Sequence, residues 1–210
     1  VYPGNQRYKR DTTGVVFTRD KKKLVAYPAG KQEDTYEIPE HVEEIGERAF
    51  EGAKNLSRVS FPAGIKVVGP YAFHHCTNLE TIELGPALTR LGTGSFKDCT
   101  SLKRAELPST LVEVEDEVFS GCASLRKTNF PSSLKRIGTS AYEDCAQLTE
   151  VPLADGLVEI GEKAFNGCST LEKLRLPPTL LTIGASAFED GVSEDVMESL
   201  RRVEIPEGTR

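Results

Sequence analysis

Cysteine residues recur in this chain at intervals of 23 positions, and thiols are well suited to metal binding, disulfide formation and nucleophilic attack. Structural zinc sites take close pairs such as C-x-x-C, whereas no two cysteines here lie nearer than 23 positions. Their number, five, excludes complete internal disulfide pairing. The spacing therefore indicates a structural repeat. The cysteines are Cys76, Cys99, Cys122, Cys145 and Cys168.

The segment "HHC" at 74–76 adds two histidines to one cysteine, which raises a metal site or a Cys–His nucleophile as alternatives. Cys76 belongs to the cysteine series, whereas His74 and His75 take places that Lys97–Asp98 and Ser120–Gly121 fill in later repeats. We interpret the histidines as polar turn residues and predict no metal site. The chain also lacks a Ser/His/Asp spacing or a phosphate-binding Gly loop, so we predict neither an enzyme nor a cofactor.

An aromatic residue stands three positions before each cysteine and follows the same period. Five positions before each aromatic stands a Val, Ile or Leu, and the residue after that is Gly in every repeat except one, which has Glu115. We predict that the aromatic and cysteine side chains point inward and stack on their counterparts in the next repeat. The aromatic series is Phe50, Phe73, Phe96, Phe119, Tyr142, Phe165 and Phe188.

A short alternation of apolar and polar residues follows each cysteine, as in "LKRAELP" at 102–108. This pattern is typical of a strand buried on one face, and the Pro that usually follows ends it. Each repeat is then one coil with a strand, a turn and an irregular or weakly extended return. Because one coil cannot bury its apolar face alone, we predict a mostly β solenoid of about seven right-handed 23-residue coils with a parallel, concave sheet.

The solenoid sets the environment of the cysteines. Adjacent coils bring successive Cα atoms within disulfide range. Side chains in register point the same way, however, and keep their Cβ atoms about 4.8 Å apart, farther than the ~3.8 Å that a disulfide prefers. We expect a ladder of buried free thiols, with disulfides as the alternative.

The repeat resembles the BspA-like, treponemal-type leucine-rich repeat, most clearly in "LVEIGEKAFNGCSTLEKLRLPPTLLTIGASAF" at 157–188. Upstream, "GVVFTRDKKKLVAYPAGKQEDTYEIPEHVEEIGERAF" is similar to the hairpin unit that precedes such repeats, with strands near 15–18 and 24–27. We therefore expect an N-terminal hairpin or capping unit over 1–35 and one continuous solenoid over 36–210. The family is known mainly from surface proteins of host-associated bacteria, and the resemblance implies adhesion or protein binding without catalysis.

Three features depart from the family pattern. Glu115 replaces the usual Gly, which we expect to alter only a turn. Pro152 is expected within a strand, at an outward position, where it would remove one ladder hydrogen bond. The segment "EDGVSEDVMESL" lengthens the last repeat, and Ser193 is a suitable N-cap for a short helix there.

Outward strand positions form charged columns along the expected sheet. The column eight residues after each aromatic, or fourteen after Phe188 because six residues are inserted there, holds Arg or Lys at five of seven places, although the whole chain has a net charge of −6. Such a basic stripe is where a repeat protein would bind a partner, and the alternative is that these charges only keep the sheet soluble. The candidate binding residues are Arg58, Thr81, Glu83, Arg104, Glu106, Lys127, Asn129, Glu150, Lys173, Arg175 and Arg202.

These observations predict a non-catalytic module that binds a protein partner, possibly a host matrix or surface protein. The acidic net charge argues against nucleic acid, no apolar run is long enough to insert into a membrane, and nothing indicates a small-molecule substrate. We expect an adhesin-like surface or secreted domain. The alternative is a cytoplasmic scaffold, since free cysteines are common in reducing compartments.

Overall fold

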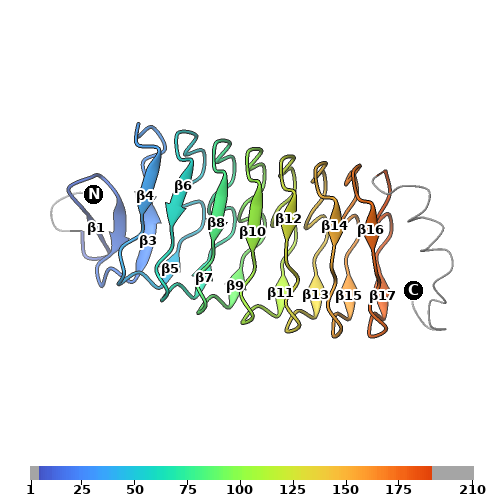
Figure 1. Cartoon of the computed structure of the whole chain (residues 1–210). Coiled ribbons are helices and arrows are strands. Elements are labelled where there is room, and N and C mark those ends of the chain that lie inside the picture. The colour runs from blue at the N-terminus through green and yellow to red at the C-terminus, as the bar shows by residue number, and fades with distance from the viewer. Residues whose placement is uncertain (1–4, 191–210) are drawn as a thin grey trace.

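The computed structural model describes residues 5–190, which form a β solenoid without any helix over that range (Figure 1). Three strands open it: β1 (Tyr8–Arg10), β2 (Val16–Thr18) and β3 (Lys23–Ala26). They pair antiparallel in chain order, and β3 then pairs in parallel with β5 (Glu44–Ile45). The N-terminal hairpin expected from the sequence is therefore present, and it continues directly into the stacked coils.

One strand of each coil lies on a common face, and we call these the main strands. Each begins 23 residues after the previous one, as the sequence period predicts. The sheet of β4, β6, β8, β10 and β12 is parallel and five-stranded, and β14 pairs with β16 separately. Within each strand of three residues from β6 to β10, the middle side chain is buried and the outer two are exposed. The main strands are β4 (Thr35–Glu37), β6 (Arg58–Ser60), β8 (Thr81–Glu83), β10 (Arg104–Glu106), β12 (Lys127–Thr128), β14 (Glu150–Val151) and β16 (Lys173–Leu174).

The returning part of each coil is more regular than the sequence indicates, because it forms a two-residue strand in every coil. These return strands pair in parallel with their neighbours, from β3 through β5 and β7 to β9 and again from β11 to β17. They are β5, β7 (Val67–Val68), β9 (Arg90–Leu91), β11 (Glu113–Val114), β13 (Arg136–Ile137), β15 (Glu159–Ile160) and β17 (Thr182–Ile183).

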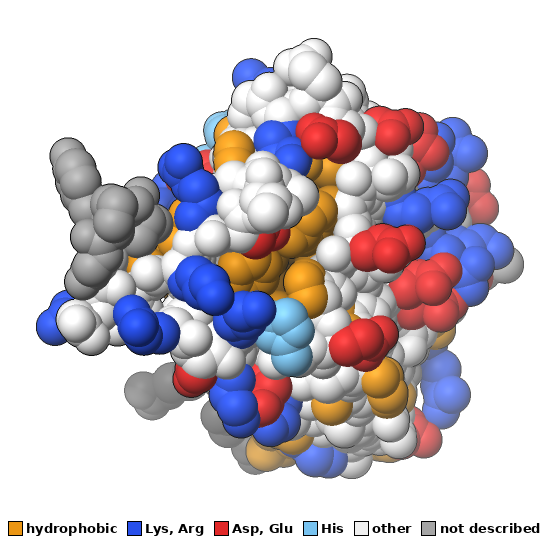
Figure 2. All heavy atoms as spheres, turned by 90° about the vertical axis from the view of Figure 1, so that its left-hand side faces the viewer, with side chains coloured by type: hydrophobic (Ala, Val, Ile, Leu, Met, Phe, Trp, Pro, Cys, Tyr) orange, Lys and Arg blue, Asp and Glu red, His pale blue; other side chains and the backbone are white. Residues whose placement is uncertain are grey.

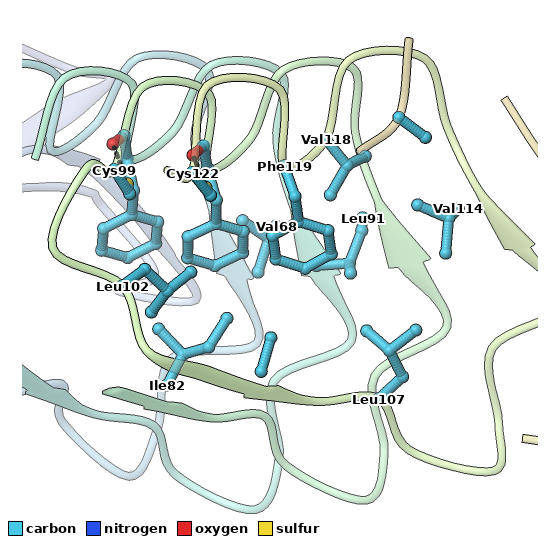
Figure 3. Packing of buried hydrophobic residues seen from close by; sticks show 14 of the residues in the cluster. Val68, Ile82, Leu91, Cys99, Leu102, Leu107, Val114, Val118, Phe119 and Cys122 are labelled. Atoms are coloured by element: carbon cyan, nitrogen blue, oxygen red, sulfur yellow. Dashed lines mark hydrogen bonds between the residues drawn. The ribbon is translucent and has the colours of Figure 1, made fainter. Parts of the chain in front are cut away.

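The core is a stack of identical layers between the main strands, the return strands and the turns. In Figure 3, Cys99 and Cys122 lie on the turns above the aromatic rings, and Ile82 and Leu107 lie on the side of the main strands. Successive rings from Phe50 to Phe188 stack with centroids 4.6 to 5.7 Å apart. Burial of these large rings is the main hydrophobic contribution of each coil.

The five cysteines are buried and free, and each thiol donates to the equivalent acceptor, the carbonyl oxygen of the aromatic residue in the preceding coil. The Sγ of Cys99 donates to the carbonyl oxygen of Phe73 at 3.2 Å, and Cys122 makes the same bond to Phe96 at 3.2 Å. Each thiol thus adds a second hydrogen bond to a carbonyl of the preceding coil that already accepts a backbone N–H, so the cysteines link neighbouring turns as well as filling a narrow corner of the core.

Glu115 changes more than a turn. A Cβ atom at the equivalent Gly92 would lie 2.7 Å from the backbone N of Pro70 in the preceding coil, so a side chain at this position requires a local shift of the backbone. The return sheet breaks at this coil, between β9 and β11. The Glu115 carboxylate replaces part of the lost ladder, because it accepts hydrogen bonds from the backbone N of Thr93 at 2.9 Å and from the Nε of Arg90 at 2.7 Å.

The prediction that Pro152 lies within a strand is wrong, because β14 ends at Val151. Pro152 lacks an N–H and cannot extend the ladder, so the strand stops before it. The main sheet is also interrupted between β12 and β14. The helix expected at Ser193 lies outside the described residues.

Candidate interaction surface

The exposed ends of the main strands form the candidate surface, because register places equivalent side chains next to one another. Arg58 and Arg104 are the partners of Thr81 on either side, Arg104 is the partner of Lys127, and Glu150 is the partner of Lys173. Parallel partners lie about 4.8 Å apart. The structure therefore places Arg58, Thr81, Arg104 and Lys127 in one column of the five-stranded sheet, and Glu150 beside Lys173 in the separate pair β14–β16.

Two cations lie side by side in this column, at Arg104 and Lys127. Both side chains are exposed, and like charges directly opposite each other in a sheet are mildly destabilising. Arg104 contacts Glu106 of its own strand, whereas Arg58 and Lys127 form no ion pair with any described residue. The positive charge is confined to the column of Arg58, Arg104 and Lys127, because the same strands carry three carboxylates in the neighbouring column, at Glu37, Glu83 and Glu106.

The return strands differ, because their cations are paired. Arg136 contacts Glu113, Asp116 at 3.2 Å and Glu159 at 3.2 Å, which joins three consecutive coils. Arg90 is bound to Glu115 at 2.7 Å. Exposed pairs of this kind contribute little to stability individually. They do neutralise the face on which they lie, so the two strand faces differ in available charge.

A second outward column stands two positions beyond the first in each coil, and it is more acidic and more varied. Glu83, Glu106 and Arg175 are exposed, and Arg175 approaches Asp155 at 4.0 Å. Asn129 has a structural part as well, since its Oδ1 accepts from the backbone N of Leu107 at 2.6 Å and its Nδ2 donates to the Leu107 carbonyl at 2.8 Å.

The side-chain positions of two candidate binding residues, Lys173 and Arg202, are not described by the structure. The backbone of Lys173 lies in β16 in register with Glu150, so its place in the column is known. Arg202 lies outside the described residues. The remaining candidates all lie on or directly after main strands, and the structure brings them together on one face.

The cysteines offer no nucleophile in the folded state. Burial raises the pKa of the Cys76 thiol to about 12 and also raises the pKa of the thiols of Cys99, Cys122, Cys145 and Cys168. The Sγ of Cys76 donates inward to the carbonyl oxygen of Phe50 at 3.1 Å. A Cys–His pair at "HHC" is therefore excluded in this structure, because the thiol points away from the two histidines.

The histidines do make contacts that the sequence analysis missed. His74 and His75 gather with Asp98, and their ligand-type atoms all lie within 4.8 Å of one another. His74 also contacts Glu51 at 3.0 Å. Glu51 precedes His74 by 23 residues and Asp98 follows His75 by 23, so the repeat period itself was the signal that could have found this cluster.

The N-terminal end carries a hollow of about 120 Å³ that has Phe17 and Pro39 on its wall and Lys9, Arg10 and Lys21 around it. Figure 2 looks onto this end, where hydrophobic side chains lie among Lys and Arg side chains. The hollow also touches His41, which packs against Phe17 with ring centroids 6.3 Å apart. No convergent set of catalytic groups lines it among the described residues.

With this geometry established, the sequence comparison identifies the class. The profile of the BspA type leucine rich repeat region matches residues 30–149 and 135–207, with six copies of the repeat. The chain therefore belongs to the BspA-type leucine-rich repeat family. This class is in general a non-catalytic repeat scaffold. Among curated proteins, no sequence matches the chain closely enough to count as a relative.

Solved structures show the same architecture. A leucine-rich repeat protein from Eubacterium ventriosum is similar with a TM-score of 0.78 and 24% identity, over 90% of this chain and 51% of that protein. A leucine rich cell surface protein from Faecalibacterium prausnitzii matches with a TM-score of 0.60 and 27% identity, over 80% of this chain and 41% of that protein. The leucine-rich repeat protein of T. pallidum matches with a TM-score of 0.60 and 21% identity, over 97% of this chain and 95% of that protein. This chain thus spans about half or less of the first two proteins.

Across residues 5–190 no helix has the length and apolar character needed to cross a membrane.

Proposed function

We propose that this solenoid is a protein-binding module and that the main strands recognise an acidic surface of a protein partner. The observation that carries the proposal is the register pairing of Arg104 with Lys127, next to the unpaired Arg58 two strands away. An acidic partner would remove the repulsion between the adjacent cations and would gain several charge-assisted contacts at once. The proposed contact residues are the candidate set named above, from Arg58 to Arg202.

We further propose that the domain works at the cell surface or after secretion, as an adhesin-like module. Membership of the BspA-type family and the similarity to a protein described as a leucine rich cell surface protein support this proposal. The coiled architecture suits it as well, because stacked coils present an extended face on which many modest contacts add up. Residues 1–35 would then serve as the capping unit for one continuous solenoid.

A cytoplasmic scaffold is the second candidate, and the five free cysteines favour it. Their burial weakens this argument, because a thiol that is shielded from solvent and has a raised pKa survives in an oxidising environment too. Both candidates require the same partner-binding face and differ only in where the partner is found.

Binding of the tag-free domain to immobilised extracellular-matrix and plasma proteins tests the proposal. We expect saturable binding to at least one acidic protein, with an association rate that falls as salt is raised, because exposed charges are screened within about 10 Å at 0.1 M salt. Binding that is indifferent to salt would contradict recognition by the basic column. Binding only to cytoplasmic extracts would favour the scaffold.

A further inference from the structure

The cluster of His74, His75, Asp98 and Glu51 has the composition of a transition-metal site. It lies on the turns that precede the main strands, where His75 and Cys76 occupy the places that Asp98 and Cys99 hold in the next coil. Imidazole nitrogen and carboxylate oxygen are the usual non-thiol ligands of Zn²⁺. The side chains of His74, Asp98 and His75 are 18%, 32% and 52% exposed, so an ion could reach them from solvent.

The contact between His74 and Glu51 fixes the chemistry of the imidazole. A carboxylate only accepts, so the Nδ1 of His74, 3.0 Å from Oε1 of Glu51, must donate. In the neutral ring the Nε2 atom then carries a lone pair. Metal-binding histidines usually donate their other nitrogen to a carboxylate, which orients the ring and raises its basicity as a ligand. Glu51 therefore stands where a supporting carboxylate is required.

The lone pair of His74 faces another acceptor. Nε2 lies 3.4 Å from Oδ2 of Asp98, and the Nδ1 of His75 lies 3.6 Å from the same oxygen. A neutral imidazole nitrogen and a carboxylate oxygen repel each other at this distance unless a proton or a metal cation lies between them. In a tetrahedral site with metal–ligand distances of about 2.0–2.2 Å, neighbouring ligand atoms are about 3.3–3.6 Å apart. The two contacts match that spacing.

The surrounding side chains hold the cluster in place. Tyr71 packs edge-on against the His74 ring with centroids 5.7 Å apart, and Arg48 lies 4.9 Å above the Tyr71 ring. Arg48 also donates to Oε1 of Glu51 at 2.5 Å, the same oxygen that accepts from His74, and so holds this carboxylate in place. A site whose ligands are oriented by a second layer of contacts loses little entropy when the metal binds.

His75 and Asp98 have backbone conformations that suit this arrangement. Both are in the left-handed region, with φ of 57° and 58°, at the same position of consecutive coils. Gly121 and Gly167 take this position in other coils. His and Asp are among the residues that tolerate the region best, so the turn can carry ligands here without a glycine. Because the two coils stack in register, the side chains of His75 and Asp98 lie next to each other.

We propose that His74, His75 and Asp98 bind one Zn²⁺ or a chemically similar divalent transition-metal ion, with Glu51 as the positioning residue for His74. Three protein ligands leave a fourth position open to water or to a group of a bound partner. The five buried thiols do not compete for the ion in the folded state, because each is engaged with a carbonyl of the core.

Calorimetric titration of the tag-free chain with Zn²⁺ in a chelator-free buffer tests this proposal. We expect one ion per chain with micromolar or tighter affinity, and a rise in melting temperature with added Zn²⁺. Asp98→Asn and His75→Asn each keep a residue that tolerates the left-handed turn, and each should weaken binding at least about tenfold. Glu51→Gln should weaken it by about 10–100-fold while the stoichiometry stays one.

His41→Asn is the matched control, because His41 is the third histidine of the chain and packs against Phe17, outside the proposed site. It should bind Zn²⁺ as the parent chain does. Circular dichroism and protection of the thiols confirm that each variant is folded. Absence of saturable Zn²⁺ binding, equal affinity in Asp98→Asn, or a loss in His41→Asn as large as that in His75→Asn would each overturn the site.

Discussion

The Sγ of Cys122 donates to the carbonyl oxygen of Phe96 in the preceding coil at 3.2 Å, in the layer directly above the stacked rings (Figure 3). The same bond recurs for every cysteine of the ladder. Cysteine suits this corner because its side chain is small, tolerates burial and supplies a weak second donor to a carbonyl oxygen that already accepts a backbone N–H in its own turn, as Phe96 does from Cys99 at 3.3 Å.

The thiols should therefore be unreactive toward disulfide reagents in the native protein. Burial raises the pKa of all five thiols, and attack on a disulfide reagent requires the thiolate. We predict no reaction with Ellman's reagent at pH 8 in buffer and release of five equivalents in 6 M guanidinium. Fast labelling in buffer would mean that the coils open readily, and fewer than five equivalents after unfolding would reveal a disulfide.

Tyr142 is the one tyrosine in the aromatic ladder, and its buried hydroxyl lies near the Thr128 side chain but makes no hydrogen bond of normal geometry to a described residue. An unsatisfied buried polar group costs about 1–3 kcal/mol. Tyr142→Phe removes the hydroxyl and restores the side chain found at the other positions of the ladder, so we expect it to stabilise the protein by about 1 kcal/mol in urea unfolding followed by circular dichroism. Lower stability in the variant would show that the hydroxyl has a partner in solution.

Glycine is required directly after the return strand, where the backbones of neighbouring coils approach closely. A Cβ atom on Gly161 would lie 2.6 Å from the carbonyl carbon of Gly138 and 2.6 Å from the backbone N of Thr139. Because both atoms belong to the backbone, the backbones of the two coils would have to shift to admit the Cβ atom. We expect Gly161→Ala to destabilise the protein by about 1–3 kcal/mol.

Gly30 provides the control for this change. A Cβ atom there meets nothing within 4 Å, so Gly30→Ala should be neutral or stabilise by up to about 1 kcal/mol. The two variants are compared by their urea midpoints at equal slope. A similar loss in both would mean that the contact at Gly161 is not the cause.

The sequence predicts the stacked coils well because a repeat of 23 residues constrains every layer in the same way. One register explains why Phe96, Cys99 and the strand around Ala105 have the same burial as their counterparts in the next coil. The sequence predicts return strands such as β9 only as irregular or weakly extended segments, since two residues are too few to show a strand pattern.

Departures from the repeat are predicted less well, because their effect depends on the neighbouring coil. Glu115 and Pro152 were read as local changes, yet the sheets are interrupted near each of them. The contacts of His74 were missed for the same reason: its partners lie one period away along the chain, and reading only adjacent residues directs attention to Cys76, which points inward.

The central claim is that the basic column of the main strands binds the partner, and a pair of matched triple variants tests it most directly. Arg58→Glu/Arg104→Glu/Lys127→Glu reverses three exposed cations on the main strands. Lys21→Glu/Lys54→Glu/Lys163→Glu reverses three exposed lysines that lie outside the strands, so the two variants have the same net charge.

The affinity of both variants is measured by surface plasmon resonance against the protein that binds the parent chain. We predict that the main-strand variant loses at least about 100-fold in affinity, because adjacent reversed charges would repel an acidic partner, while the control changes less than about threefold. Equal losses would reduce the effect to net charge. Unchanged binding by the main-strand variant would place the site on another face and contradict the proposed function.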